Sequence, residues 1–376
     1  MALSQVGLER LNTATTKKIG TSKNIIINGA MQVAQRGSSS TTAGYQTVDR
    51  FVASWSGQDE APTQAQVDVA SGTTPYTLGF RKAFKITNGN QTGGAGASDL
   101  AYYEHHIEAQ DIASSGWNYT SSSSNITLSF WVKSSVSQDF KGYLRTADGT
   151  SQIYPYSTGT LSADTWTKVT KTIPGNSNLQ FDNNNESGLQ LYLWPYIGTT
   201  YTDAGVTENA WTAYASGTRT PVSATTWWTT NDATIEITGV QLEVGSVATD
   251  FEHRSFAEEL ALCQRYYYRW TAGASGNKYL WIGQAYSSSA CFGVIRTLPV
   301  TMRAIPTASA SGTFTPFGDD GSVAGHSAFS STNIDNNTVN DLATTGWSGG
   351  SGISGGDAVV VVASSGSDYI DASAEL

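Results

Sequence analysis

The fold of this chain divides at the stretch Ser255-Phe-Ala-Glu-Glu-Leu-Ala-Leu-Cys-Gln-Arg-Tyr-Tyr-Tyr268, which has the pattern of a helix. The stretch begins with a capping box, because the Ser255 hydroxyl can accept from the first turn while Glu258 bonds back to the backbone of the cap. Apolar residues recur along it at offsets of three and four, the period of a helix. A helix this short is marginal alone in water, so its apolar side must pack on another surface.

Two adjacent apolar rows run along this predicted helix, and together they are wider than one small sheet face requires. The helix either docks on its own domain or lies at a seam between subunits. We favour the subunit seam and predict an oligomer interface made of Phe256, Leu260, Leu262, Cys263, Tyr266 and Tyr267.

The composition indicates a β-rich protein without a phosphate-binding surface. Charged residues make up 14% and hydrophobic residues 39% of the 376 positions, and 38 glycines supply turns. A net charge of −10 argues against binding to nucleic acid or an anionic membrane. No apolar run approaches the roughly 20 residues that span a bilayer, and the N-terminus lacks an export signal. We therefore expect synthesis in the cytoplasm and no membrane insertion.

The sequence offers no frame for catalysis or metal binding. Cys263 and Cys291 are expected to be buried free thiols, because neither sits in a metal-type pair. His105 and His106 are adjacent, so a regular element points them apart. No nucleophile elbow or phosphate loop occurs. We predict no catalytic residue, no metal ligand and no cofactor, and leave open whether a cation such as Ca²⁺ braces the fold.

Alternating apolar and polar residues predict antiparallel strands on both sides of the helix. Before it, the clearest runs are 126–133, 166–173, 189–194 and 234–244, together with a short strand at 24–27. In the run 234–244 the alternation slips at Gly239, which predicts a β-bulge there. After the helix, the runs 279–286, 290–296 and 359–362 predict a smaller β domain, with the first two forming an antiparallel pair.

The segment 312–356 is mostly Gly, Ser, Thr, Asn and Asp, with aromatic residues set singly. It is either a surface loop or a variable recognition surface in which the lone aromatic rings contact a ligand. These rings are Phe314, Phe317, Phe329 and Trp347.

Two groups of motifs frame the first part of the chain. The front group is Asn24-Ile-Ile-Ile-Asn-Gly29, Gln35-Arg36-Gly37 and Val48-Asp49-Arg50-Phe51. The back group is Gly239-Val-Gln-Leu-Glu243, Gly245-Ser246, Phe251-Glu-His-Arg254, Glu258-Glu-Leu-Ala-Leu-Cys-Gln-Arg-Tyr-Tyr267 and Leu298-Pro-Val-Thr-Met-Arg-Ala-Ile-Pro306. Together they resemble a module of bacteriophage tail fibre and receptor-binding proteins, a module that is similar to carbohydrate-binding jelly rolls. The resemblance covers residues 24–303, although residues 90–230 match only in their general pattern and carry no specific motif.

This resemblance implies an all-β virion component of the phage tail, made in the host cytoplasm and assembled as a homotrimer. The expected domains are an N-terminal anchor to other phage tail proteins (1–23), a jelly-roll β-sandwich (24–254), the linking helix (255–268) and a smaller C-terminal β domain (269–376). Residues 1–23 also fit a poorly ordered terminal segment.

The aromatic content favours binding to host cell-surface polysaccharide. Eleven Trp and 18 Tyr exceed what a β core of this size would bury. Exposed rings stack on the C–H faces of sugars, whereas the alternative is that they pack a second sheet or a neighbouring subunit. Trp227 and Trp228 are adjacent, so one of them must face outward if they lie in a strand. The predicted glycan-binding residues are Trp117, Tyr119, Trp194, Tyr196, Trp227 and Trp228.

We therefore expect a non-catalytic, multivalent adhesin that recognises host surface glycan. Two alternatives stay open. One is a depolymerase of surface polysaccharide, and the other is a structural connector or decoration of the virion without a receptor role.

Overall fold

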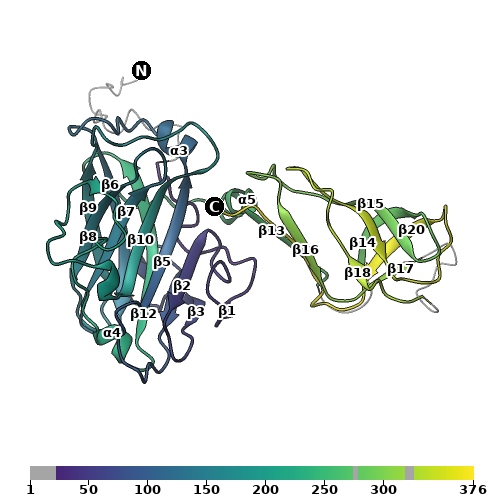
Figure 1. Cartoon of the computed structure of the whole chain (residues 1–376), viewed down its shortest axis with the longest axis horizontal. Helices are drawn as coiled ribbons and strands as arrows, with labels where there is room; N and C mark the ends of the chain where they lie inside the picture. The colour runs from purple at the N-terminus through teal and green to yellow at the C-terminus, as the bar shows by residue number, and fades with distance from the viewer. Residues whose placement is uncertain (1–22, 274–277, 318–325) are drawn as a thin grey trace, which may run out of the picture. The chain divides into compact units, whose positions relative to one another are not determined.

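The computed structural model describes residues 23–273, 278–317 and 326–376, and it confirms an all-β fold (Figure 1). The predicted anchor at 1–23 lies outside the described residues except for Lys23. The described chain forms two compact units. The first comprises residues 23–31, 41–43 and 53–254, and the second comprises 32–40, 44–52 and 255–376. Residues 32–40 and 44–52 thus belong with the C-terminal part of the chain, which the sequence did not predict.

The first unit is a jelly-roll β-sandwich built on two six-stranded sheets, except that β1 and the first two residues of β2 are grouped with the second unit. Sheet 1 has the order β1-β3-β4-β12-β6-β9. Its strands are β1 (Ser39–Ser40), β3 (Thr63–Asp68), β4 (Lys82–Thr87), β12 (Thr234–Val244), β6 (Asn125–Ser134) and β9 (Thr167–Pro174). Sheet 2 has the order β11-β8-β7-β10-β5-β2. Its strands are β11 (Thr212–Ala213), β8 (Gln152–Thr160), β7 (Asp139–Thr146), β10 (Ser187–Ile197), β5 (Leu100–Glu108) and β2 (Phe51–Ser56).

Tyr103 shows how the inner faces of the two sheets meet. Its side chain points inward from β5, and its hydroxyl donates to the carbonyl of Ile235 at 2.8 Å and accepts from the backbone of Ile86 at 2.9 Å. Its ring lies 5.1 Å from that of Phe84. Aromatic side chains therefore fill the interior while their polar tips satisfy backbone groups of the opposite sheet. Short helical turns connect the strands: α2 (Thr74–Thr77), α3 (Ala109–Ala113), η2 (Thr199–Tyr201) and α4 (Thr226–Thr229).

The strands predicted at 126–133, 166–173, 189–194 and 234–244 are confirmed as parts of β6, β9, β10 and β12. The strand predicted at 24–27 is wrong, since that segment has no strand assignment. It runs beside β12 and is fixed there by Asn24, whose side chain donates to the carbonyl of Val240 and accepts from the backbone of Leu242. A side chain thus replaces part of the ladder that the apolar run had suggested.

The bulge predicted at Gly239 is confirmed. The register of β12 against β6 shifts between Thr238 and Gln241, and Gly239 has a φ of +63°. A Cβ at this position would lie 2.6 Å from the ring of Phe80. Glycine is therefore required both for the backbone conformation and for the close approach of the ring.

Helix α5 (Phe256–Gln264) has the predicted capping box at Ser255 and Glu258. It ends earlier than predicted, because Tyr267 already begins β13 (Tyr267–Thr271). The residues predicted for the oligomer interface differ in their exposure. Phe256 is 55% exposed, Leu260 and Leu262 are half-buried, whereas Cys263, Tyr266 and Tyr267 are buried. Burial raises the pKa of the Cys263 thiol well above its usual value.

The second unit contains a three-stranded and a six-stranded sheet around one core. The smaller sheet has the order β13-β21-β16, with β21 (Tyr369–Ser373) and β16 (Thr307–Ser311). The larger has the order β17-β20-β14-β15-β19-β18. Its strands are β17 (Phe314–Phe317), β20 (Ala358–Ala363), β14 (Lys278–Ala285), β15 (Ala290–Thr297), β19 (Asp341–Ser348) and β18 (Ser331–Thr332). The predicted pairing of β14 with β15 is confirmed.

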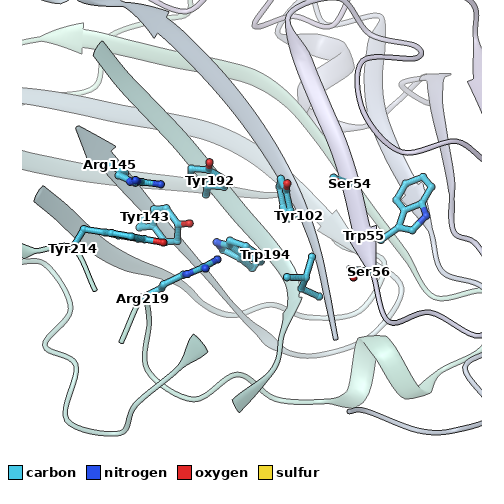
Figure 2. Close-up of a pocket in the computed structure, with 11 residues that line it drawn as sticks. Ser54, Trp55, Ser56, Tyr102, Tyr143, Arg145, Tyr192, Trp194, Tyr214 and Arg219 are labelled. Atoms are coloured by element: carbon cyan, nitrogen blue, oxygen red, sulfur yellow. The ribbon is translucent and has the colours of Figure 1, made fainter. Parts of the chain in front are cut away.

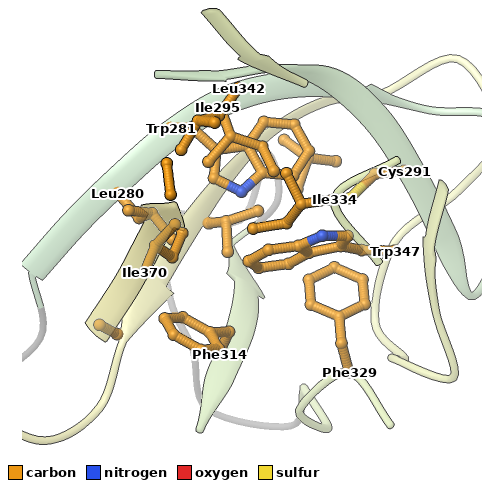
Figure 3. Close-up of a cluster of buried hydrophobic side chains, with 14 of the residues drawn as sticks. Leu280, Trp281, Cys291, Ile295, Phe314, Phe329, Ile334, Leu342, Trp347 and Ile370 are labelled. Atoms are coloured by element: carbon orange, nitrogen blue, oxygen red, sulfur yellow. The ribbon is translucent and has the colours of Figure 1, made fainter. Parts of the chain in front are cut away.

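Three of the aromatic residues set singly in 312–356 belong to this core (Figure 3). The ring of Trp347 lies 5.2 Å from Phe314 and 5.7 Å from Phe329, and all three are buried. The hypothesis that these rings contact a ligand is therefore wrong for them. A strand with small polar residues on its outer face can carry one large side chain that points inward. For this reason the polar composition of residues 312–356 did not indicate a core.

A buried ionic cluster ties three separate segments of the second unit together. The Arg50 side chain has no exposed surface, forms an ion pair with Glu375 and lies 3.4 Å above the ring of Tyr266. Arg36 pairs with the same carboxylate at 3.2 Å. Burial raises the pKa of the neighbouring Asp49 to about 6, although its hydrogen bond from Gln35 opposes that shift.

Replacing Gly239 by Ala should lower the free energy of unfolding by about 2–4 kcal/mol. Alanine is strained at the positive φ of this position, and its methyl group would overlap the ring of Phe80. Chemical denaturation measures the effect. Gly72→Ala is the matched control, because Gly72 has a φ of +85° and an added methyl group there would meet nothing within 4 Å. Equal losses in the two variants would show that contact with Phe80 is unimportant.

Candidate functional site

An open hollow of about 340 Å³ lies on the outer face of sheet 2 (Figure 2). Its lining comes from β2, β5, β7 and β10 and from the segment between β11 and α4. The lining residues are Ser54, Trp55, Ser56, Leu100, Tyr102, Tyr143, Arg145, Tyr192, Trp194, Tyr214 and Arg219. The ring of Trp55 is directed away from the other labelled side chains in Figure 2, so the hollow is centred on β5, β7 and β10.

The two-residue period of β10 places its aromatic side chains in this hollow. Leu191 and Leu193 alternate with Tyr192 and Trp194, so the two kinds of side chain lie on opposite faces. Tyr192 is directly opposite Tyr143 of the neighbouring strand β7. The aromatic face is therefore produced by strand pairing between positions that are far apart in the sequence.

Four rings form the floor of the hollow. The ring centroids of Tyr143 and Tyr192 are 4.5 Å apart, and those of Tyr102 and Trp194 are 4.7 Å apart. Tyr192 and Trp194 are nearly parallel, with 13° between their planes and 5.7 Å between centroids. Such contacts hold the rings in fixed positions. Tyr143, Tyr192 and Trp194 are buried whereas Tyr102 is half-buried, so Tyr102 is the ring of the floor that faces the hollow most openly.

Polar contacts on the same face fix Tyr192. Its hydroxyl donates to the Glu104 carboxylate, which also lies 2.5 Å from Nε2 of His106. Nδ1 of that histidine is 3.0 Å from the hydroxyl of Ser187. Burial, followed by the Glu104 charge, raises the pKa of Tyr192. The tyrosine therefore stays neutral and remains a hydrogen-bond donor at any ordinary pH.

Two arginines lie at the hollow beside Tyr214 (Figure 2). The guanidinium carbon of Arg145 is 3.9 Å from the centre of the Tyr214 ring, and that of Arg219 is 5.9 Å from it. The indole nitrogen of Trp194 is buried and has no hydrogen-bond partner within the described residues. The hollow thus combines an aromatic floor with donors of hydrogen bonds.

The six residues predicted to bind glycan do not form one site. Only Trp194 lines the hollow. Trp227 and Trp228 are fully buried in α4, so the expectation that one of them faces outward is wrong; a short helix replaces the assumed strand. Tyr196 is buried against Trp228, with ring centroids 5.2 Å apart. These three rings close one end of the sandwich, where a sugar ring cannot reach them.

Trp117 and Tyr119 lie in a separate loop. Trp117 is buried, and its indole nitrogen donates to the carbonyl of Ser124 at 3.1 Å. Tyr119 is half-buried and meets the ring of Phe181 edge-on at 4.9 Å. These residues pack the loop and are not among those that line the hollow.

The structure adds Tyr102, Tyr143, Tyr192 and Tyr214 to the aromatic residues of the hollow. The alternation in β10 was the one available signal for Tyr192, since it occupies the same face as Trp194. Nothing local distinguishes Tyr102 or Tyr143 from a core tyrosine. Their places follow from the order of the strands in the sheet.

Neither metal binding nor membrane crossing is indicated by residues 23–273, 278–317 and 326–376. In these residues no three His, Cys, Asp or Glu side chains gather closely enough to hold a metal ion. Over the same ranges, the helices are too short or too polar to traverse a bilayer.

The chain matches no protein-family model and no curated protein. Among solved structures it is similar to the enzymatically active domain of tailspike protein 4 of bacteriophage CBA120, with a TM-score of 0.32 and 11% identity over 59% of this chain and 21% of that one. A family 4 carbohydrate-binding module gives a TM-score of 0.30 and 12% identity, covering 58% of this chain and 98% of its own. The N-terminal cellulose-binding domain of Cellulomonas fimi β-1,4-glucanase C gives 0.27 and 12%, with 58% and 99% covered. Similarity this distant supports no conclusion about this chain, so its function must be inferred from its own residues.

Replacing Tyr192 by Phe should lower the free energy of unfolding by about 1–3 kcal/mol, because the buried Glu104 carboxylate loses a donor. Chemical denaturation measures the change. Tyr143→Phe is the control: the same face of the same sheet loses a hydroxyl that has no hydrogen-bond partner within the described residues, and we expect a change below about 0.5 kcal/mol. Equal effects in the two variants would contradict the role assigned to the Tyr192 hydroxyl.

Proposed function

We propose that this chain binds saccharide in the hollow on the outer face of sheet 2, without chemical turnover. The observation that carries the proposal is the floor of four packed rings, Tyr102, Tyr143, Tyr192 and Trp194, in an open hollow of about 340 Å³. A volume of this size suits a short oligosaccharide, since binding sites for small ligands are usually about 300–1,000 Å³.

The arrangement of the side chains fits the chemistry of a sugar ring. A pyranose has one flat face of C–H groups, which gains contact area on an aromatic surface, and an edge of hydroxyl groups that require partners. Ser54 and Ser56 offer hydroxyls at one side of the hollow, and Arg145 and Arg219 offer donors at another. Because the rings are fixed by mutual packing, little conformational entropy is lost when a ligand binds.

We further propose that the chain is a subunit of a phage tail fibre and assembles as a homotrimer. The support is the resemblance of the front and back motifs to tail fibre and receptor-binding modules. Three copies would carry three weak sites, and the second and third contacts would be intramolecular, which raises the overall affinity for a polysaccharide surface. The half-buried or exposed apolar residues Phe256, Leu260 and Leu262 of α5 are the candidates for the subunit contact.

Tyr102→Ala and Tyr214→Ala should each weaken saccharide binding about tenfold or more, because each removes part of the stacking surface. Both residues are half-buried, so their loss is compatible with folding. A glycan array followed by calorimetry on the strongest hit measures the effect.

Tyr279→Ala is the control for these variants, because Tyr279 is 70% exposed on the second unit and lies outside the hollow. It should bind as the unaltered protein does. An array without hits would overturn the proposal, and stable incorporation of such a protein into particles would instead favour a structural connector or decoration.

The trimer is tested by sedimentation equilibrium at micromolar concentration, where we expect three times the mass of one chain. Phe256→Glu should shift the distribution toward monomer, because it places a charge on the proposed contact. Ala257→Glu, at a neighbouring exposed position outside the apolar rows, is the control. A monomeric unaltered protein contradicts the proposal.

A second candidate function, hydrolysis of an ester substituent on a surface polysaccharide, is favoured by one observation. Ser187, His106 and Glu104 are linked in series at 3.0 and 2.5 Å, the order of groups in a nucleophile, base and orienting acid. This linkage lies on the strand face that also carries Tyr192. Release of acetate from an O-acetylated glycan, lost in Ser187→Ala, would establish this activity and reject simple binding.

A further inference from the structure

The two arginines of the hollow, Arg145 and Arg219, are held in place by tyrosine rings. Arg145 stands on β7, and Arg219 lies between β11 and α4. Both stack on Tyr214, and Arg219 also lies 4.5 Å from the ring centre of Tyr201. Stacking on aromatic faces restricts a guanidinium while leaving the atoms of its planar edge available for hydrogen bonds.

Each guanidinium uses one nitrogen within the protein. Nε of Arg145 donates to the Ser151 hydroxyl at 3.1 Å, and Nε of Arg219 donates to the carbonyl of Ser216 at 3.1 Å. Within the described ranges, the terminal amino groups of both residues lack a hydrogen-bond acceptor and an ion-pair partner. The pair of terminal amino groups is the part of arginine that binds a planar oxyanion through two parallel hydrogen bonds.

Four arginines elsewhere in the chain are ion-paired, whereas Arg296 of the second unit, like Arg145 and Arg219, donates through Nε alone, to the hydroxyl of Tyr268. Arg36, Arg50, Arg254 and Arg269 each form an ion pair with a carboxylate. The protein has 31 acidic and 21 basic residues, so carboxylates are in excess. What sets Arg145 and Arg219 apart is that both stack on Tyr214 at one hollow, and that neither has an acidic partner in the described part of the chain.

Carboxylates on the same face are already engaged by other groups. Glu104 accepts from Tyr192 and lies against His106. Lys141 holds both Asp139 and Glu208, at 2.8 and 2.9 Å. The acidic groups nearest the hollow thus bind their own partners, and the terminal amino groups of Arg145 and Arg219 remain for a ligand.

We propose that the saccharide bound in the hollow is acidic and that Arg145 and Arg219 bind its carboxylate. This inference rests on the proposed saccharide-binding function and names the ligand class: a sugar acid whose ring stacks on the aromatic floor while its carboxylate faces the two guanidinium groups. The indole N–H of Trp194 lies beside the same floor but is buried, so the two guanidinium groups are the donors that a ligand can reach.

The test compares acidic oligosaccharides with their carboxyl-reduced forms, which keep every ring and lose only the charge. The probes are tetrasaccharides of galacturonate, glucuronate-containing hyaluronan and sialate, each with its reduced counterpart, measured by calorimetry in about 50 mM salt, where charge interactions are weakly screened. We expect at least one acidic probe to bind about tenfold or more tightly than its reduced form. Arg145→Gln and Arg219→Gln should each abolish that preference, measured within each variant as the ratio of its affinities for the acidic and the reduced form.

Arg81→Gln is the matched control, because Arg81 also stacks on a tyrosine, Tyr76 at 4.0 Å, but lies outside the hollow. It should keep the preference. Equal affinity for the acidic and the reduced probes would overturn the acidic ligand. If Tyr102→Ala then loses affinity for both probes, the proposed saccharide-binding function stands. Tight binding of a sulfated tetrasaccharide alone overturns the assignment of a carboxylate. Failure of every saccharide, charged or neutral, to bind overturns the proposed function itself.

Discussion

Strand β10 must be buried on both of its faces, and the candidate site depends on that constraint. It lies between β5 and β7 in sheet 2, where Leu191 and Leu193 pack inside the sandwich. Tyr192 and Trp194 point the other way and are almost fully covered. Aromatic neighbours on β5 and β7 supply that cover, because rings bury large areas while keeping polar edges. The packing that stabilises the outer face therefore also fixes the rings beneath the hollow.

The motifs that carry the family resemblance serve the framework of the protein. Asn24 bonds to the backbone of β12, and Arg50 is buried with Glu375 and Tyr266. The hollow draws most of its lining from residues 100–219, the part of the chain that matches only in its general pattern.

Local features of the fold could be predicted from the sequence, since their causes are local. Gly239 breaks an alternation, and Ser255 with Glu258 forms a capping box within one turn. The aromatic hollow could not be predicted, because it requires knowing that β10 lies between β5 and β7. Trp227 and Trp228 show the opposite error: their apparent exposure assumed a strand where the chain forms a short helix.

The ion pair between Arg50 and Glu375 joins positions 325 residues apart. Most of the sandwich is synthesised between these two partners, which takes about 15–65 s at about 5–20 residues per second. During that interval Arg50, in the segment 44–52, lacks the Glu375 carboxylate with which it forms its ion pair. The first unit can thus complete most of its sheets before Glu375 is synthesised. The second unit folds later, because its residues lie both before and after residues 53–254 of the first unit. A fragment starting at Ser255 would retain Glu375 and lack both of its arginines.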